Sequence, residues 1–457
     1  MKDMPSYFTA YDIRGRVPDE LNEKIAARIG EAYCETFSPT KVAVGRDMRL
    51  SSPALSDASI TGILGCGVDV VDLGLCGTEE VYFAAFSQEY EGIDGGIMVT
   101  ASHNPAEYNG MKIVQKGARP VSANSGLQAI AEKLTKTAET PFVVENQSSH
   151  GVCEQRYGKD AYIRHLLSYV NPEILRPLKL VVNPGNGCAG PVIDLLEQHL
   201  PFSFIRMHDH PDGTFPNGVP NPLLPQNREE TALAVKKHNA DLGIAWDGDF
   251  DRCFFFDENG RFIEGYYIVA FLGAALLEEH PGETILYDPR LTWNTIETVK
   301  RLGGKPVMTR TGHAFIKEKM RSTRAIYGGE MSAHHYFRDF GYCDSGMIPW
   351  LLVTQLISSR GKTLSAMVDD MMKDFPVSGE INSKVADPDS VLKKIEQQYG
   401  DGYLEYIDGV SVTYDRYRFN IRKSNTEPLL RLNVESRGDK QLLDAKTEEL
   451  LALIRQE

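Results

Sequence analysis

The chain has 457 residues, of which 42% are hydrophobic and 25% charged, so it is too long for one core and predicts three or four domains at about 100–150 residues each. Its formal net charge of −14 argues against nucleic acid and anionic membranes as partners. No apolar run approaches the length that crosses a bilayer, and the first residues lack a charged-then-apolar signal, so we expect a cytoplasmic protein.

Three consecutive stretches repeat one plan of predicted elements. In each, a strand ends in polar or glycine-rich residues, a helical span and a second strand follow, and a third strand leads into a charged loop. The strands with their following loops are residues 41–49, 67–75 and 95–103, then 178–187, 202–210 and 240–251, then 283–291, 305–313 and 324–335. Near-continuous apolar strands separated by helices predict mixed or parallel sheets covered on both faces.

The last part of the chain, from about residue 379, follows a different pattern. We predict a short strand, a charged helix over 390–399, alternating strands that include 417–422 and 429–436, and a final amphipathic helix from about 439. The predicted fold class is therefore α/β: three similar α/β domains with mixed sheets, plus a C-terminal α+β domain, around a central cleft. The predicted domains are 1–149, 150–252, 253–367 and 368–457.

Two short polar runs at the ends of predicted strands suggest chemistry. Residues 100–105 (TASHNP) follow an apolar strand, so the Ser102 hydroxyl is expected on a loop at the carboxyl end of a sheet, where α/β folds keep their active sites. Residues 247–252 (DGDFDR) place Asp247, Asp249 and Asp251 at alternate positions after another apolar strand. Such a set of hard oxygen ligands suits Mg²⁺ better than zinc.

Three other patterns have competing interpretations. The aspartate run has the spacing of an EF-hand loop, but Arg252 stands where that loop needs glycine, and the flanking residues predict strands. Residues 185–190 (GNGCAG) form a lone GxGxxG, which we interpret as a strand-to-helix turn because nothing else indicates redox chemistry. The seven cysteines show no CxxC spacing and are expected to be reduced, mostly packed thiols.

Together with two further motifs, these runs resemble the α-D-phosphohexomutase family. The further motifs are residues 329–334 (GEMSAH) and 422–428 (RKSNTEP), in the order expected for that family, so the resemblance spans most of the chain. It is closest to bacterial phosphomannomutases. It implies that Ser102 carries a phosphoryl group and, with the three aspartates, binds Mg²⁺.

The resemblance also implies roles for the other motif residues. Glu330 would accept hydrogen bonds from two sugar hydroxyls, which suits a pure acceptor, and Ser332 would assist. Lys112, Arg14 or His313 would handle the hydroxyl proton, and the sequence does not choose among them. The remaining substrate-binding residues would be Arg252 and His334, with a phosphate clamp of Arg422, Ser424, Asn425 and Thr426.

Neighbouring residues complete the expectations for the site. His103 is expected to point away from Ser102 in an extended loop, and His335 is assigned to structure. Arg290 stands where relatives often have lysine, which keeps the charge but changes its geometry.

The activity implied is interconversion of mannose 1-phosphate and mannose 6-phosphate through phosphoserine and a hexose 1,6-bisphosphate, which also serves as activator. Its product would supply GDP-mannose synthesis. Phosphoglucomutase or dual specificity is the alternative, and an Mg²⁺-dependent sugar phosphatase and a non-catalytic sugar-phosphate sensor stay open. The partners would be small-molecule hexose phosphates, with the oligomeric state left open. Because the bound intermediate must rotate end for end, we expect the segment after about residue 370 to close on the sugar phosphate by hinge rotation.

Overall fold

The computed structural model describes residues 5–137, 151–423 and 429–455. The chain divides into two compact units, which are Met1–Phe262 with Tyr336–Gly361, and Ile263–His335 with Lys362–Glu457.

The first unit is built on two sheets with helices on their faces. The strands of these two sheets are β1 (Ile13–Arg16), β2 (Lys41–Arg46), β3 (Asp69–Leu75), β4 (Gly95–Val99), β5 (Tyr108–Gln115), β6 (Arg119–Pro120), β7 (Cys153–Gln155), β8 (Lys179–Asn183), β9 (Ser203–Arg206), β10 (Leu242–Trp246), β11 (Cys253–Phe256) and β12 (Phe262–Ile263), the last at the unit's boundary. The unit also contains strand β17 (Cys343–Asp344), which lies outside these sheets, and has β16 (His335–Phe337) at its other boundary. Its α-helices are α1 (Glu23–Phe37), α2 (Ser52–Gly65), α3 (Thr78–Phe86), α4 (Leu127–Thr137), α5 (Asp160–Leu167), α6 (Gly190–Glu197), α7 (Glu229–His238) and α11 (Ile348–Arg360). Its 3-10 helices are η1 (Lys116–Ala118), η2 (Ala123–Ser125), η3 (Pro172–Ile174), η4 (Pro225–Asn227) and η5 (Arg338–Phe340).

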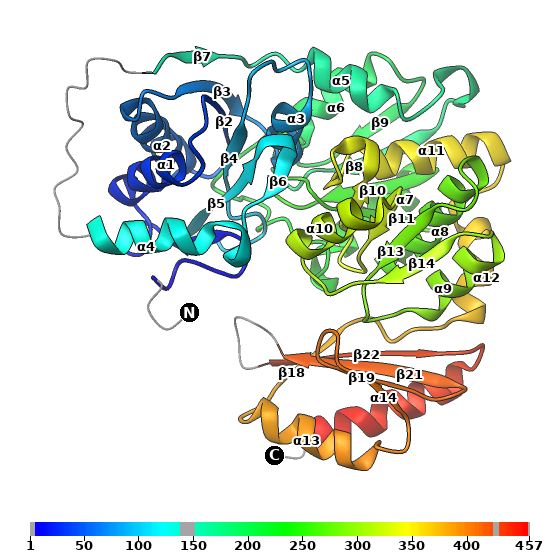
Figure 1. Cartoon of the computed structure of the whole chain (residues 1–457). Coiled ribbons are helices and arrows are strands. Elements are labelled where there is room, and N and C mark those ends of the chain that lie inside the picture. The colour runs from blue at the N-terminus through cyan, green and yellow to red at the C-terminus, as the bar shows by residue number, and fades with distance from the viewer. Residues whose placement is uncertain (1–4, 138–150, 424–428, 456–457) are drawn as a thin grey trace. The chain divides into compact units, whose positions relative to one another are not determined.

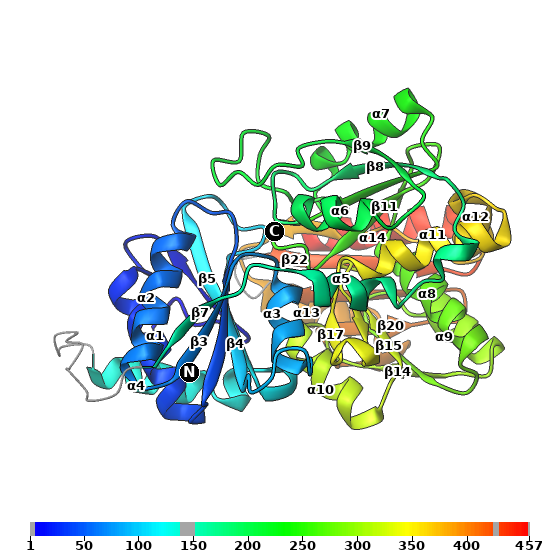
Figure 2. The ribbon, with the colours of Figure 1, turned by 90° about the horizontal axis from the view of Figure 1, so that it is seen from above.

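The first sheet brings the loops after β2 and β4 to one edge. Its strand order is β1-β5-β4-β2-β3-β7, with β6 paired to β5. Strand β2 runs parallel to β3 and β4, whereas β5 is antiparallel to β4, so the sheet is mixed. Helices α1 and α2 cover one face and α3 the other (Figure 2). Because parallel neighbours end at the same edge, the segments that follow β2 and β4 lie side by side.

The second sheet carries the aspartate loop. Strand β8 lies between β9 and β10 and is parallel to both, and β11 returns antiparallel to β10. The aspartate run therefore connects two strands, as predicted, and not the two helices of an EF-hand. The glycine-rich run after β8 leads into α6, as expected for a strand-to-helix turn.

The second unit has a parallel three-strand core and an antiparallel sheet. Its strands are β13 (Thr284–Tyr287), β14 (Lys305–Met308), β15 (Tyr327–Gly329), β18 (Ile381–Lys384), β19 (Tyr403–Glu405), β20 (Val410–Thr413), β21 (Tyr417–Lys423) and β22 (Leu429–Ser436). Its helices are α8 (Gly265–Glu279), α9 (Trp293–Arg301), α10 (His313–Thr323), α12 (Leu364–Asp374), α13 (Pro388–Gln398) and α14 (Lys440–Arg455). Strand β13 pairs in parallel with both β14 and β15.

The C-terminal sheet has the order β18-β22-β21-β20-β19, and every neighbouring pair in it is antiparallel. Helices α13 and α14 lie together against one face of this sheet, at the bottom of Figure 1. Strands β21 and β22, which flank residues 424–428, coincide with the two alternating segments predicted as strands.

The predicted fold class, α/β domains with mixed sheets plus an α+β C-terminal part, is confirmed. The domain boundaries stay a prediction. Residue 252 precedes β11, which pairs with β10, and residue 367 lies within α12. In the part of the chain that the structure describes, no helix is both long and apolar enough to span a membrane.

Candidate active site

The Ser102 loop begins at the end of β4 and is tied to the end of β2. Ser102 is 1% exposed. Its backbone N–H donates to Thr100 Oγ1 at 2.9 Å, and the Thr100 hydroxyl in turn donates to Asp47 Oδ2 at 2.7 Å. Two buried hydrogen bonds thus tie the Ser102 backbone through Thr100 to Asp47, which follows the neighbouring strand β2.

Arg49, which is also 1% exposed, holds the path of this loop. Its two terminal nitrogens donate to the carbonyl oxygens of Ser102 (2.8 Å), Asn104 (2.6 Å), Pro105 (2.8 Å) and Tyr108 (2.9 Å). Its Nε lies 3.3 Å from Asp47 Oδ2 in an ion pair, so the four hydrogen bonds of the guanidinium all come from its two terminal nitrogens. A single buried side chain therefore gathers four main-chain carbonyls of the Ser102 loop.

Arg14 supports the loop from β1. Its Nη1 donates to Ala101 O at 2.9 Å and to the side-chain oxygen of Asn104. Asp12 holds the guanidinium in turn, with 2.9 Å to both Nε and Nη2. In this structure Arg14 therefore holds the loop around Ser102 by hydrogen bonds to residues on both sides of the serine.

The aspartate loop lies directly against the Ser102 hydroxyl. Ser102 Oγ donates to Asp247 Oδ2 at 2.8 Å. Asp247, Asp249 and Asp251 are all buried, and one carboxylate oxygen of each lies within 4.8 Å of the others. A Cβ at Gly248 would stand 2.7 Å from Ser102 O, so only glycine allows the two loops to approach this closely.

Buried positive charges partly offset the three carboxylates. Lys112 on β5 places Nζ 2.6 Å from Asp249 Oδ2 and 2.5 Å from Asp251 Oδ2, and Arg252 Nε lies 3.5 Å from Asp247 Oδ2. Burial alone would lower the pKa of Lys112, but Asp249 and Asp251 outweigh it and raise that pKa. Burial and the other two carboxylates raise the pKa of Asp247 to about 7, which marks an excess of negative charge at this point.

The donor set fits a hard divalent cation. Three carboxylates supply the oxygens, and Asp249 Oδ1 is buried with no hydrogen-bond partner among the described residues. A buried carboxylate oxygen without a donor is costly, and a cation would remove that cost. The residues are thus able to hold Mg²⁺ beside the Ser102 hydroxyl.

Thr78, which the sequence analysis did not single out, also binds the aspartate loop. It opens α3, its N–H donates to Asp249 O at 3.1 Å, and its Oγ1 donates to Asp249 Oδ2 at 2.5 Å. The next residue, Glu79, is fully buried and accepts from Ser345 Oγ at 2.9 Å and Gly346 N at 2.6 Å. The N-terminus of α3 therefore positions one aspartate and anchors itself to the start of α11.

His103 corrects one prediction. We expected it to point away, but its Nδ1 lies 2.9 Å from Ser102 Oγ. Ser102 has a φ of 50°, so the chain turns at this residue instead of extending, and the ring folds back toward the hydroxyl. Burial and then Arg252 lower the pKa of His103 well below its ordinary value.

The second unit contains the predicted sugar loop. Glu330 follows β15, is 3% exposed, and accepts from Gly312 N at 3.1 Å. His313 is the next residue after Gly312 and begins α10. The Glu330 N–H donates to His334 O at 2.9 Å, which closes the turn that contains Ser332.

Arg290 connects this loop to the C-terminal sheet. Its fork binds Asp288 at 3.0 and 2.8 Å, and Nη2 lies 3.3 Å from Ser332 Oγ and 3.6 Å from Glu330 Oε1. Its Nη1 lies 3.7 Å from Glu380 Oε2. The arginine uses a bidentate geometry that a lysine would not offer.

Arg422, from the predicted phosphate clamp, also meets Glu380, with Nη2 3.0 Å from Oε2. Arg431 Nη1 lies 3.5 Å from the other oxygen of that carboxylate. The remaining clamp residues Ser424, Asn425 and Thr426 lie outside the described residues. Three guanidinium groups thus surround one carboxylate where an anion clamp was predicted.

The structure therefore brings the predicted residues together in two sets, one in each unit. We call the first the nucleophile cluster, formed by Ser102, Asp247, Asp249, Asp251, Lys112, Arg14 and Arg252. The second, the sugar-loop cluster, consists of Glu330, Ser332, His334, His313 and Arg422. His335 is fully buried and its Nδ1 lies 2.6 Å from the Tyr327 hydroxyl, as expected of a structural histidine.

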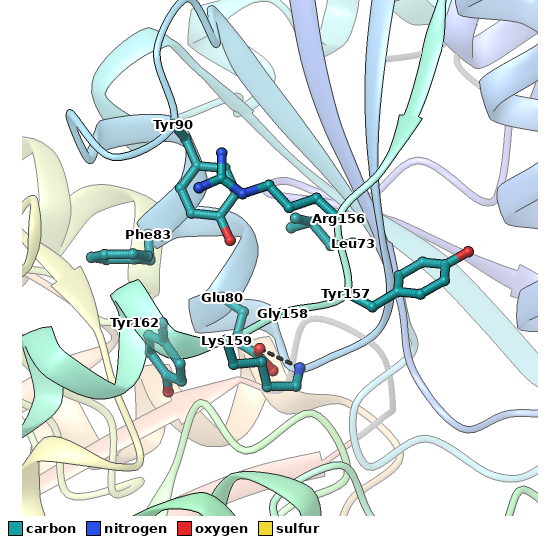
Figure 3. A pocket seen from close by; sticks show the side chains of 9 residues that line it. All are labelled: Leu73, Glu80, Phe83, Tyr90, Arg156, Tyr157, Gly158, Lys159 and Tyr162. Atoms are coloured by element: carbon teal, nitrogen blue, oxygen red, sulfur yellow. Dashed lines mark hydrogen bonds and ion pairs between the residues drawn. The ribbon is translucent and has the colours of Figure 1, made fainter.

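A separate small pocket in the first unit contains none of these residues. Figure 3 shows its lining, in which Lys159 pairs with Glu80 and Arg156 lies over the Tyr90 ring. Its volume of about 10 Å³ is near what one water molecule needs, so it has no room for a sugar phosphate.

Comparison with known proteins identifies the family. Four phosphoglucomutase/phosphomannomutase models match in order, the alpha/beta/alpha domains I (residues 5–141), II (160–260) and III (264–375) and the C-terminal domain (380–452). The chain belongs to the phosphoglucomutase/phosphomannomutase family. It is therefore an isomerase of the phosphotransferase type.

Individual family members match over nearly the whole chain. A phosphomannomutase of Escherichia coli K12 is 55% identical over 454 residues, covering 98% of both chains. A protein of Xanthomonas campestris named as phosphohexose mutases is 56% identical over 450 residues, covering 98% of this chain and 99% of the relative. A crystal structure of a family protein from Burkholderia thailandensis superposes with a TM-score of 0.86 at 31% identity, covering 99% and 98% of the two chains.

Proposed function

We propose that this protein is a phosphomannomutase that interconverts mannose 1-phosphate and mannose 6-phosphate through a phosphorylated Ser102 and a hexose 1,6-bisphosphate. The observation that carries the proposal is the position of Ser102 Oγ, 2.8 Å from Asp247 and within a loop whose carbonyls Arg49 holds. Relatives named phosphomannomutase at about 55% identity support the choice of sugar. The product would serve GDP-mannose synthesis, and a hexose 1,6-bisphosphate would act as activator.

The charges of the nucleophile cluster support phosphoryl transfer. A phosphoryl group on Ser102 would add nearly two negative charges beside three carboxylates, so the site would need a divalent cation as well as Lys112, Arg14 and Arg252. Bound by the three aspartates, Mg²⁺ would supply Lewis-acid stabilisation of the transferring group. The chain itself would contribute fixed positive charge and a rigid nucleophile.

Proton handling has one more candidate than the sequence suggested. Lys112, Arg14 and His313 were predicted for this role, and His103 Nδ1 lies 2.9 Å from Ser102 Oγ, within the range for direct proton transfer. Lys112 is engaged by two carboxylates, which favours its charged form and an electrostatic role. We propose His103 as a further candidate for proton handling beside Lys112, Arg14 and His313, although in this structure the Ser102 hydroxyl donates to Asp247.

The sugar-loop cluster would bind the substrate in either orientation. Glu330 would accept from two vicinal hydroxyls with Ser332 beside it, and His334 and His313 would contact the sugar. Arg422 with Ser424, Asn425 and Thr426 would bind the phosphate that does not react. We further propose the domain division at 149, 252 and 367, with the last domain closing on the substrate.

The test is turnover of mannose 1-phosphate and glucose 1-phosphate with Mg²⁺ and a trace of glucose 1,6-bisphosphate, with free phosphate measured in parallel. We expect conversion to the 6-phosphates with little phosphate release and a higher kcat/KM for the mannose compound. S102A should lose turnover. S87A, which removes another hydroxyl of the first unit, should keep it.

The other outcomes identify the alternatives. A higher kcat/KM for glucose 1-phosphate would make the protein a phosphoglucomutase. Phosphate release equal to substrate loss would indicate a sugar phosphatase, and binding without turnover a sugar-phosphate sensor.

A further inference from the structure

Helices α1 and α2 run parallel on one face of the first sheet, and their backbones touch (Figure 1). A Cβ at Gly30 would stand 2.5 Å from Ser59 O, and one at Gly62 would stand 2.0 Å from Ala27 O. The Ser59 hydroxyl also donates to Ala26 O at 3.1 Å. These contacts fix the register of the two helices over successive turns.

This register brings two cysteines together. Cys34 lies four residues after Gly30 and Cys66 four residues after Gly62, so each stands one turn beyond a contact point. The register therefore places the two side chains beside each other on the adjoining helices, and Cys66 packs against the core cluster that contains Cys34. The Cys66 thiol itself donates to Gly62 O at 3.5 Å.

The two thiols differ in exposure and acidity. Cys34 is 5% exposed, whereas Cys66, at the end of α2, is partly exposed. The neighbouring Cys34 side chain lowers the pKa of Cys66, although burial and Glu31 and Glu35 oppose this. The same contact, with burial, raises the pKa of Cys34. Cys66 is therefore the more accessible thiol of the pair, and it is the one whose pKa is lowered.

We propose that Cys34 and Cys66 are an oxidisable pair that forms a reversible disulfide, with Cys66 as the thiol that reacts with a hydroperoxide and Cys34 as the thiol that resolves it. This inference does not depend on the proposed function.

The chemistry balances with the hydroperoxide as oxidant. The Cys66 thiolate attacks one peroxide oxygen, an S–O bond forms, the O–O bond breaks, and an alcohol or water leaves after protonation. Cys34 sulfur then attacks Cys66 sulfur, the S–S bond forms, and the S–O bond breaks to release water with the Cys34 proton. Two thiols are oxidised by two electrons and one peroxide is reduced, and an added dithiol reverses the bond by exchange.

The remaining thiols offer an internal control. Cys153 on β7 is exposed and was not among the contacts between α1 and α2. Cys76 and Cys188 are buried against the sulfur atoms of Met98 and Met48. A reaction governed by exposure alone would select Cys153, whereas one governed by the thiol pair selects Cys66.

The experiment compares the wild-type chain with C34S, C66S and C153S after mild hydrogen peroxide treatment. We expect the wild type and C153S each to lose two titratable thiols and 2 Da, with a Cys34–Cys66 peptide that disappears after dithiothreitol. C34S should form a dimedone adduct at position 66, because no resolving thiol remains, and C66S should form neither product.

Three results would overturn the proposal. These are full retention of thiols in the wild type under conditions that oxidise C34S at position 66, loss of the disulfide in C153S, or an unchanged disulfide yield in C66S. Thermal melting of each reduced variant, expected within a few degrees of the wild type for this single-atom exchange, verifies that the chains compared are folded.

Discussion

Replacing Arg49 by lysine tests whether one buried guanidinium fixes the position of Ser102. Arg49 donates four hydrogen bonds to main-chain carbonyls of the Ser102 loop. Lysine keeps the charge but has three N–H donors, so at least one of these hydrogen bonds is lost. Hydrogen bonds to charged groups contribute about 1.5–3 kcal/mol each, which gives a loss of at least about 1.5–3 kcal/mol.

If the lower figure acts on the transition state, kcat falls roughly tenfold at about 1.4 kcal/mol per factor of ten. The KM for the hexose phosphate should change by less than a few-fold, because the sugar-loop cluster is untouched. Initial rates in the coupled mutase assay, with saturating Mg²⁺ and 1,6-bisphosphate, measure both constants. Thermal melting of R49K reports the stability cost separately.

The matched control is R46K at the end of the same strand. Arg46 is 24% exposed at its side chain and pairs with Asp72 at 3.6 Å, an interaction of small expected value. R46K should keep kcat within about twofold. An R49K protein that keeps kcat within threefold of the wild type would refute the argument that these carbonyl contacts position Ser102.

Three further changes test other parts of the first unit. T78V removes the hydroxyl bound to Asp249 and should raise the Mg²⁺ concentration for half-maximal activity about tenfold, as measured by titrating the rate with Mg²⁺. This factor corresponds to the lower end of the energy of a hydrogen bond to a charged group. G248A places a Cβ 2.7 Å from Ser102 O and should lower kcat at least tenfold with the fold retained by circular dichroism. Burial raises the pKa of Glu79 from 4.5 to about 8, so its contribution to stability is present below pH 4.5 and is lost as the pH rises to 8. Between pH 5 and 8, the free energy of unfolding of the wild type relative to that of E79Q should therefore fall by about 1.4 kcal/mol per pH unit. Melting temperatures of the two proteins across this range report the difference.

Each of these predictions has its own contrary result. T61V removes an exposed helix hydroxyl and should leave the Mg²⁺ titration unchanged, so an equal shift in both variants would contradict the role of Thr78. Gly65 has open space around its Cβ position, so G65A should be active, and equal activity in G248A would contradict the close approach of the loops. A constant difference between wild type and E79Q across the pH range would show that Glu79 does not titrate there.

Much of the fold could be predicted because the strand and loop signals are local. Apolar runs such as 240–246 and their polar ends mark β10 and the aspartate loop directly. The family motifs then indicated Ser102 and the aspartates. Nothing local, however, determines the φ of one loop residue, and the left-handed turn at Ser102 reversed the prediction for His103.

The supporting residues were missed because their function depends on contacts distant in sequence. Arg49 reaches carbonyls more than fifty positions away, and Thr78 binds Asp249 across 171 positions. A signal did exist for Arg49. It follows β2, the parallel neighbour of β4, so its loop had to lie at the same sheet edge as Ser102.

The contacts of Arg49 with the Ser102 loop do not depend on which side chains the loop carries. All four acceptors are main-chain oxygens, which every amino acid carries. Side chains from 102 to 108 can therefore be exchanged while the anchor keeps its partners. A lineage could retune the reactivity of this loop without first finding a new way to build it, and an alanine placed at Ser102 should report lost chemistry and not a displaced backbone.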